Sequence, residues 1–359
     1  MRVLGCVTLL GLLCMVACSG GEDGPRGAAA QTGGAGTAAG GSSVLPSGGS
    51  SIAVPSGGST ASGGSGPVAG SAPVGNAGGT TSHGGSPPSN DNGDSDAHVI
   101  TWVPPYHVAE SKQRLNADFG GAGMADGLSY LALQFWITDG AGTRLDQVSE
   151  GDISWFHDWA RQHGVKILLC VDNNTGEWNW PEAVRAYRDN REAFAQHLLG
   201  QVMTRDFDGV DLDFEGIVEA TADEQSTHKQ FVETLATSLH AMGKVLTLDS
   251  FHGQWNAPNW NWWPDLLPLV DGITTMGYEQ SGLDVDYQNL IDHATAAPKK
   301  LMIGVPSYQG TWQNHTVTEQ LTWLVNQGQV GTAIWDASLQ AAEWRQASVW
   351  NQLKAIKSR

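Results

Sequence analysis

Three acidic residues stand at alternate positions within the segment 208–215, whose sequence is DGVDLDFE. Side chains of a β-strand point alternately to its two faces, so Asp211, Asp213 and Glu215 would share one face. Carboxyl groups held close together raise one another's pKa, which keeps a carboxylic acid protonated at neutral pH. The pattern therefore predicts general acid–base chemistry, with Glu215, the last of the three, as the proton donor.

Two other uses of these carboxyl groups fit the sequence less well. Carboxylate oxygens also bind magnesium or calcium, but no histidine accompanies them on this strand and the spacing is not that of a calcium-binding loop. A purely structural use is unfavourable, because like charges on one face of a buried strand repel one another. We therefore expect no metal ion and no other cofactor.

The segment with the carboxyl groups is one of eight short apolar segments that recur at intervals of roughly 30 residues. Segments of helical spacing lie between them, such as 153–163, 191–203, 230–242 and 320–326. This alternation predicts a parallel sheet, and eight units in about 260 residues predict an α/β fold of the (β/α)8 or TIM-barrel type. The predicted strands are 99–103, 130–135, 166–171, 209–214, 245–248, 272–276, 301–305 and 331–335.

The segment 208–215 resembles the Asp-x-x-Asp-x-Asp-x-Glu signature of glycoside hydrolase family 18, the chitinase-like enzymes, and it lies on the fourth predicted strand as in that family. The similarity extends to 276–279 (MGYE), 303–308 (IGVPSY) and Trp335, so it covers the chain from about 98 to 359. The resemblance implies that the 2-acetamido oxygen of the substrate attacks the anomeric carbon and that the product retains its configuration.

The resemblance also assigns roles to residues. Glu215 would act as acid and then as base, and Asp213 would orient the acetamido group and stabilise the oxazolinium. Asp211 would tune Asp213, and Tyr278 would hydrogen-bond the acetamido oxygen. Trp335 would form the floor under the reacting sugar. The further residues expected to bind substrate are Met276, Glu279, Tyr308 and Trp255.

Three features depart from the family pattern. The third strand ends in Asp-Asn-Asn at 172–174, where the family often has Ser-x-Gly-Gly, so one wall of the binding site would differ. Glu279 stands where many members carry Asp. Only about 25 residues separate the last two strands, which predicts a shallow, open cleft and endo action.

Several tryptophans fall in the loops that follow the third and fifth predicted strands. Active sites of such barrels lie at the carboxyl ends of the strands, so we expect exposed tryptophans there to extend a glycan-binding surface. The residues concerned are Trp178, Trp180, Trp255, Trp260, Trp262 and Trp263.

These observations predict an endo-acting hydrolase of β-1,4-linked N-acetylglucosamine polymers such as chitin. An endo-β-N-acetylglucosaminidase acting on N-glycans would share the mechanism and the barrel, and a peptidoglycan-type substrate carries the same acetamido group. A non-catalytic, lectin-like barrel that binds chitooligosaccharides is the alternative from another class. The presence of both Glu215 and Tyr278 favours catalysis over binding alone.

The N-terminal part of the chain predicts export. Residues 1–18 combine a basic start, an apolar run and small residues before Cys18, which is typical of a bacterial lipoprotein signal with lipidation at that cysteine. Residues 19–97 contain no Phe, Trp or Tyr and are rich in Gly, Ser and Ala, which predicts a disordered linker before a catalytic domain at 98–359. We expect a bacterial cell-envelope location, with the lipid as the only membrane contact.

Charge narrows the class of partner. From residue 98 onward the chain has 17 basic and 32 acidic side chains, so it would repel nucleic acid phosphates. A neutral glycan is compatible with this charge. We expect a monomer.

Overall fold

The computed structural model describes residues 98–359, apart from 147, 217–218, 255 and 284–285. The predicted signal, Cys18, the linker and Trp255 therefore lie outside the described residues. Within the described ranges, no helix combines the length and the apolar character needed to cross a membrane.

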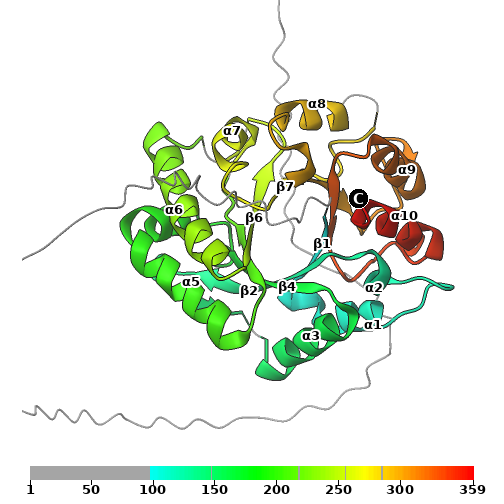
Figure 1. Cartoon of the computed structure of the whole chain (residues 1–359), viewed down its shortest axis with the longest axis horizontal. Helices are drawn as coiled ribbons and strands as arrows, with labels where there is room; N and C mark the ends of the chain where they lie inside the picture. Colours follow the sequence, from blue (N-terminus) through cyan, green and yellow to red (C-terminus); the bar gives the residue numbers. More distant parts are fainter. Residues whose placement is uncertain (1–97, 147, 217–218, 255, 284–285) are drawn as a thin grey trace, which may run out of the picture. The chain divides into compact units, whose positions relative to one another are not determined.

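Eight parallel strands form a closed barrel at the centre of the described chain (Figure 1). Each strand pairs with the next in sequence, and β1 pairs with both β2 and β11, which closes the ring. This confirms the predicted (β/α)8 barrel. The strands are β1 (Val99–Val103), β2 (Tyr130–Thr138), β4 (Lys166–Asp172), β5 (Gly209–Asp213), β6 (Val245–Phe251), β7 (Gly272–Met276), β8 (Leu301–Pro306) and β11 (Gly331–Trp335).

Helices surround the barrel on its outside (Figure 1). The predicted helices correspond to α3, α5, α6 and α9, but α6 begins eight residues earlier, because Thr221 and Glu224 form a capping box that starts it. The helices are α1 (Val108–Leu115), α2 (Met124–Gly127), α3 (Glu150–His163), α4 (Trp180–Val184), α5 (Arg191–Arg205), α6 (Ala222–Ala241), α7 (Trp263–Leu266), α8 (Asp286–His293), α9 (Val317–Gln327) and α10 (Ala347–Lys357).

Three short strands were not predicted. Strand β3 (Thr143–Leu145) lies antiparallel to the end of β2. Strands β9 (Thr311–Trp312) and β10 (His315–Thr316) form a small hairpin between β8 and α9. These strands are only two or three residues long, so hydrophobic alternation along them is too brief to detect.

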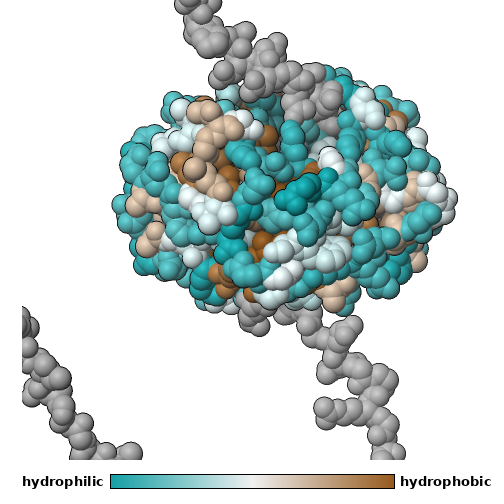
Figure 2. All heavy atoms as spheres, turned by 60° about the horizontal axis from the view of Figure 1, so that its bottom comes forward, coloured by the Kyte–Doolittle hydropathy of each residue, from teal (hydrophilic) through white to brown (hydrophobic). Residues whose placement is uncertain are grey.

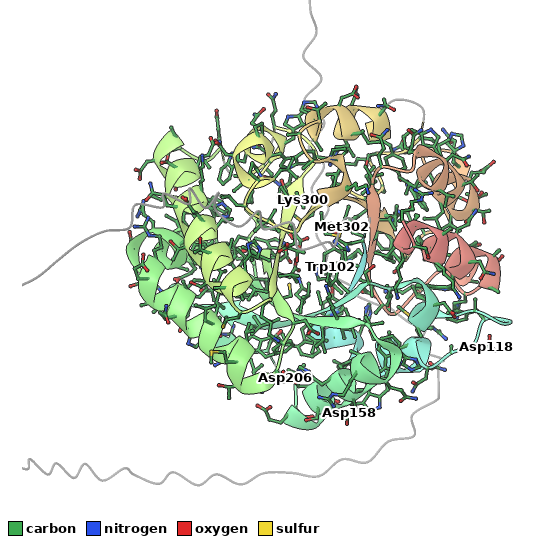
Figure 3. All side chains as sticks on the ribbon, in the orientation of Figure 1. Trp102, Asp118, Asp158, Asp206, Lys300 and Met302 are labelled. Atoms are coloured by element: carbon green, nitrogen blue, oxygen red, sulfur yellow. The ribbon has the colours of Figure 1, made fainter. Side chains whose placement is uncertain are left out.

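The apolar residues form two clusters, one between the barrel and its helices and one inside the barrel. Figure 3 shows Trp102 and Met302 in the middle of the ring, whereas Asp118 and Asp158 lie at its outer edge. Strand β5 contributes Val210 and Leu212 to the outer cluster. Alternation along the strand therefore turns its acidic residues into the barrel.

Hydrophilic residues predominate on the face shown in Figure 2, and the hydrophobic ones appear as small separate groups. This surface agrees with the excess of acidic side chains in the sequence.

Candidate active site

Glu215 lies two residues beyond the end of β5, on the side of the barrel where the parallel strands end. Its main chain is held by Asn173, which follows β4. The Glu215 N–H donates to Asn173 Oδ1 at 2.8 Å, and Asn173 Nδ2 donates to the Glu215 carbonyl at 2.7 Å. Asn173 is fully buried. The amide therefore fixes the main chain of Glu215 against the neighbouring strand.

Asp211 lies deepest of the three predicted carboxyl groups and is fully buried. Trp102 Nε1 donates to its Oδ2 at 2.8 Å, and the Thr247 hydroxyl donates to its Oδ1 at 2.5 Å. Burial raises the pKa of Asp211, whereas these hydrogen bonds and one with Cys170 lower it. Donors from the two neighbouring strands β4 and β6 and from the more distant strand β1 thus hold this carboxyl group in one orientation.

Asp213 is 2 % exposed and lies between Asp211 and Glu215. Gln134 Nε2 donates to its Oδ2 at 2.7 Å. Its Oδ1 has no hydrogen-bond partner in the described part of the chain. Burial, and then the charge of Asp211, raise the pKa of Asp213 to about 7. One oxygen of this carboxyl group is therefore fixed, and the other is able to accept a proton or a hydrogen bond.

Glu215 is half-buried. Burial raises its pKa well above the usual value, and the charge of Asp213 and a hydrogen bond with that carboxyl group raise it further. Two carboxylates in contact cannot both ionise easily, so the pair keeps a proton at neutral pH. The structure thus brings together the three carboxyl groups that the sequence predicted to share one face, with Glu215 outermost.

Two further buried carboxyl groups border this set. Asp172 ends β4 beside Asp213 in the strand register, is 4 % exposed and accepts a hydrogen bond from Asn174 N at 2.8 Å. Asp249 on β6 is 3 % exposed. Burial raises the pKa of both, and neighbouring carboxylates raise it further. Sequence reasoning missed their role, although Asp249 stands two residues after Thr247 and therefore shares its inward face.

Aromatic rings lie beside the carboxyl groups. The ring of Tyr278, which follows β7, is stacked on that of Trp335 at the end of β11, with centroids 6.3 Å apart and planes 6° apart. Trp335 also lies 5.9 Å from Trp102. A Cβ on Gly304 would stand 2.0 Å from the Thr275 carbonyl oxygen and 2.6 Å from Cδ1 of Tyr278, so glycine is needed at this position. Tyr278 and Trp335 are half-buried and thus partly open to a ligand.

The other residues predicted to bind substrate occupy different depths. Met276 is 5 % exposed at the end of β7, and its carbonyl accepts a hydrogen bond from His252 Nδ1 at 2.5 Å. Tyr308 is 38 % exposed, and its hydroxyl donates to Glu279 Oε2 at 2.8 Å. The structure joins Glu279 and Tyr308 by this hydrogen bond, whereas the side chain of Met276 is buried. Trp255 lies outside the described residues.

The expectation that the loop tryptophans are exposed is wrong for three of them. Trp180, Trp262 and Trp263 are at most 5 % exposed. Trp180 packs against Trp262, with ring centroids 6.4 Å apart, and Trp263 Nε1 donates to Ser250 Oγ at 2.8 Å. These residues hold the loops on the barrel because they pack against one another. Trp178 and Trp260 are half-buried.

One group of side chains in the described ranges has the spacing of a metal site. Ligand atoms of Cys170, Asp213 and Asp249 lie within 4.8 Å of one another. A metal would require the thiolate and the ionised carboxylates. Burial raises the pKa of the Cys170 thiol well above its usual value, and the nearby aspartates raise it further. The group therefore favours bound protons over a metal ion.

Comparison with known sequences defines the class of this protein. The sequence model of the glycosyl hydrolases family 18 matches residues 102–356. The chain belongs to that family and is a glycosidase. A search of curated proteins by sequence finds no match.

Solved structures share the fold at low sequence identity. A chitinase from Chromobacterium violaceum ATCC 12472 is 14% identical with a TM-score of 0.57, and the alignment covers 73% of this chain and 99% of that one. The spore cortex-lytic enzyme SleL of Bacillus megaterium QM B1551 is 11% identical with a TM-score of 0.56, with 72% and 74% covered. A class V chitinase from Nicotiana tobaccum in complex with NAG4 is 10% identical with a TM-score of 0.55, with 72% and 99% covered.

Proposed function

We propose that this glycosidase cleaves β-1,4-linked N-acetylglucosamine polymers such as chitin, at internal bonds and with retention of configuration. The observation that carries the proposal is the pairing of Glu215 with buried Asp213 at the strand ends, where burial and the adjacent charge raise the pKa of Glu215. Such a group is protonated at neutral pH and can donate to a glycosidic oxygen. The solved chitinases with the same fold support the choice of substrate class.

Proton transfer in the proposed reaction involves Glu215 twice. The group first donates its proton to the leaving glycosidic oxygen, while the acetamido oxygen of the substrate bonds to the anomeric carbon. The resulting glutamate then takes a proton from the water that attacks the same carbon. Asp213 and Glu215 lie on one strand and its extension, whereas the two-carboxylate mechanism needs groups on opposite sides of the sugar. This placement is compatible with the mechanism that the family resemblance implies, in which the substrate's own acetamido group is the nucleophile.

The neighbours of Glu215 would stabilise the cationic intermediate. The Asp213 carboxylate would accept the acetamido N–H and balance the positive charge of the oxazolinium. Asp211, which Trp102 and Thr247 hold in place, would tune Asp213 through its charge. The Tyr278 hydroxyl would donate to the acetamido oxygen.

Substrate contacts would come from the rim and from the aromatic floor. The half-buried ring of Trp335 offers a flat apolar surface to the reacting sugar, and the linked pair Glu279 and Tyr308 would bind a neighbouring unit. Between β8 and β11 the chain contains only a two-stranded hairpin and α9. So short a connection supports an open site and internal cleavage. Trp255 and Met276 complete the proposed contacts.

The sequence supports a location outside the cytoplasm for this activity. Cys18 follows an apolar signal segment, and the Gly-rich segment 19–97 would tether the catalytic domain to a lipid anchor. Mass spectrometry of the membrane fraction from expressing bacteria tests this. A diacylglyceryl group on Cys18 supports the anchor, and a mature chain that begins elsewhere contradicts it.

Substrate identity is tested on the full chain with three substrates in parallel. These are chitohexaose, a high-mannose glycoprotein and purified peptidoglycan, and mass spectrometry follows the products. Shorter chitooligosaccharides without glycan release support the proposal. Release of N-glycans alone indicates an endo-β-N-acetylglucosaminidase. Binding of chitohexaose without cleavage indicates a lectin-like protein.

The role of Glu215 is tested by Glu215→Gln, which keeps the size of the side chain and removes the transferable proton. We expect kcat on chitohexaose to fall at least 1,000-fold, on the order of the general acid contribution, while binding persists. Glu233→Gln on the exposed face of α6 is the matched control and leaves kcat unchanged. Equal activity of Glu215→Gln and the wild type contradicts the assignment.

A further inference from the structure

Asp249 is an acidic residue that the barrel does not need for packing. It lies on β6, pairs with Thr274 of β7 in the strand register and is 3 % exposed. Two residues earlier, Thr247 donates to Asp211 inside the barrel, so alternation directs Asp249 to the same interior one layer nearer the strand ends. An apolar side chain would fill that position at lower cost, because an ionised carboxylate is expensive to bury.

The position of Asp249 relative to Asp213 explains its presence. Oδ1 of Asp249 and Oδ1 of Asp213 are both buried, and neither has a hydrogen-bond partner in the described ranges. A carboxylate oxygen of each residue lies within 4.8 Å of the other and of Cys170 Sγ. Two buried acceptors without a donor carry a desolvation cost, and two ionised carboxylates at this separation repel. Protonation of Asp249 removes the repulsion and supplies a donor to Asp213.

The groups around Asp249 favour its neutral form. Asp211, Asp213 and Glu215 face it from β5 and its extension. Cys170 faces it from β4, where Asp172 adds a further carboxyl group beside Asp213, and Tyr278 faces it from the end of β7. These titratable neighbours are all acidic. The Cys170 thiol is hydrogen-bonded to Asp211, and Thr274 is hydrogen-bonded to Asp249, which lowers the pKa of Asp249. Glu215 is hydrogen-bonded to Asp213 and loses its proton during the reaction, which leaves Asp249 as the further donor available to Asp213.

We propose that Asp249 is a positioning residue of this site, whose neutral carboxyl group donates a hydrogen bond to Oδ1 of Asp213. The role rests on the proposed function, because Asp249 acts on the acetamido group only through Asp213. Gln134 fixes Oδ2 of Asp213 and Asp249 fixes Oδ1, so the carboxylate is held from both sides. The proton on Asp249 also remains when Glu215 has donated its own. Asp213 is then the oriented anion nearest the oxazolinium.

The hydrogen bond is tested by comparing two variants of Asp249 in the full chain. Asp249→Ala removes the donor, and we expect kcat on chitohexaose to fall about 10–100-fold, with a smaller change in KM. Asp249→Asn supplies an amide donor of the same shape, so its kcat should be at least tenfold higher than that of Asp249→Ala. Leu248→Ala, on the same strand but in the outer cluster, controls for loss of packing and leaves kcat unchanged. Equal losses in both Asp249 variants overturn the proposal.

The pH profile gives a readout that a packing role would not change. The alkaline limb of kcat/KM reports loss of the Glu215 proton. If Asp249 is neutral, Asp249→Asn alters no charge and leaves the midpoint of that limb in place. If Asp249 is ionised, the variant removes a negative charge near Glu215, lowers its pKa and moves the midpoint to lower pH. A downward shift therefore overturns the proposal.

Infrared spectroscopy tests the proton on Asp249 without relying on activity. At neutral pH the wild type should show the carbonyl stretch of protonated carboxylic acids. In Asp249→Asn the intensity of that band should be lower by the contribution of one carboxyl group. An unchanged band overturns the proposal. Inactivity of the wild type on all three substrates would instead contradict the proposed function and leave the infrared result standing.

Discussion

Asn173 connects the ends of β4 and β5, because it binds both main-chain polar groups of Glu215. In Asn173→Ala, the Glu215 N–H and carbonyl lose their partners. An unsatisfied buried polar group costs about 1–3 kcal/mol, so two of them predict a loss of about 2–6 kcal/mol in the free energy of unfolding. A displacement of the catalytic group by about 1 Å is enough to lower kcat about 100-fold.

Two measurements test this prediction. Urea unfolding gives the change in the free energy of unfolding, and steady-state hydrolysis of chitohexaose gives kcat. Asn289→Ala, on the exposed side of α8, is the matched control and should change stability by less than about 0.5 kcal/mol. If Asn173→Ala loses stability but keeps full kcat, the amide supports the fold without positioning Glu215, and our reasoning is refuted.

The variant Asn173→Asp separates position from charge. It keeps the acceptor for the Glu215 N–H but replaces the donor to the Glu215 carbonyl with a negative charge. A new negative charge near Glu215 raises its pKa. We therefore expect the alkaline limb of kcat/KM to move to higher pH. A shift to lower pH would contradict the electrostatic account of the site.

Two further predictions concern protonation and packing. Because burial raises the pKa of Glu215, the folded state binds more protons than the unfolded state above about pH 4.3, so stability should fall as the pH rises through that window. The free energy of unfolding is measured with urea from pH 5 to 8 in the wild type and in Glu215→Gln. Its decrease with pH should be shallower in the variant by up to about 1.4 kcal/mol per pH unit. Equal slopes in the two proteins would contradict a proton on Glu215. Gly304→Ala would drive a Cβ against the Thr275 carbonyl of β7 and into the ring of Tyr278, so we expect kcat/KM to fall at least about tenfold. Gly200→Ala on α5, where a Cβ meets open space, is its control and should keep wild-type activity; equal activity of both variants would show that the ring tolerates displacement.

The barrel itself was predictable because its signal is carried by runs of residues. Each strand is apolar for about five residues, and the face of each helix that packs on the barrel repeats at a helical period. The carboxyl set of β5 was predictable for the same reason, since alternation along one strand fixes which side chains share a face. Glu215 follows the strand closely enough for this pattern to extend to it.

The neighbours of that set come from other strands and were harder to predict. The predicted fifth strand ended at residue 248, because Asp249 and Ser250 interrupt the apolar run, whereas β6 continues to Phe251. Asp249 and Ser250 remain in the strand because they pair with β7 and are buried by the surrounding side chains. Asn173 was noted only as a departure from a family pattern. Its contact with Glu215 joins positions 42 residues apart, which no local pattern reveals.

The loop tryptophans show a second reason why burial was not predictable from the sequence. Their spacing in the loops predicted exposure, but Trp180 and Trp262 bury each other's surface across two loops. Trp263 similarly finds a partner for its indole N–H on β6. Contacts between separate loops depend on the final geometry of the barrel. Composition at the strand ends therefore does not distinguish a ligand-binding ring from one that packs the loops together.

The thiol inside the barrel has a consequence for the chemical durability of the site. Cys170 is fully buried, and burial together with the surrounding aspartates raises its pKa. Oxidants and disulfides react with thiolates that they can reach, so this side chain is protected both by its protonation and by its position. At the proposed location outside the reducing cytoplasm, the cysteine neither needs a disulfide partner nor acquires an unwanted one. The acidic set that surrounds it can therefore include a sulfur atom without becoming sensitive to oxygen.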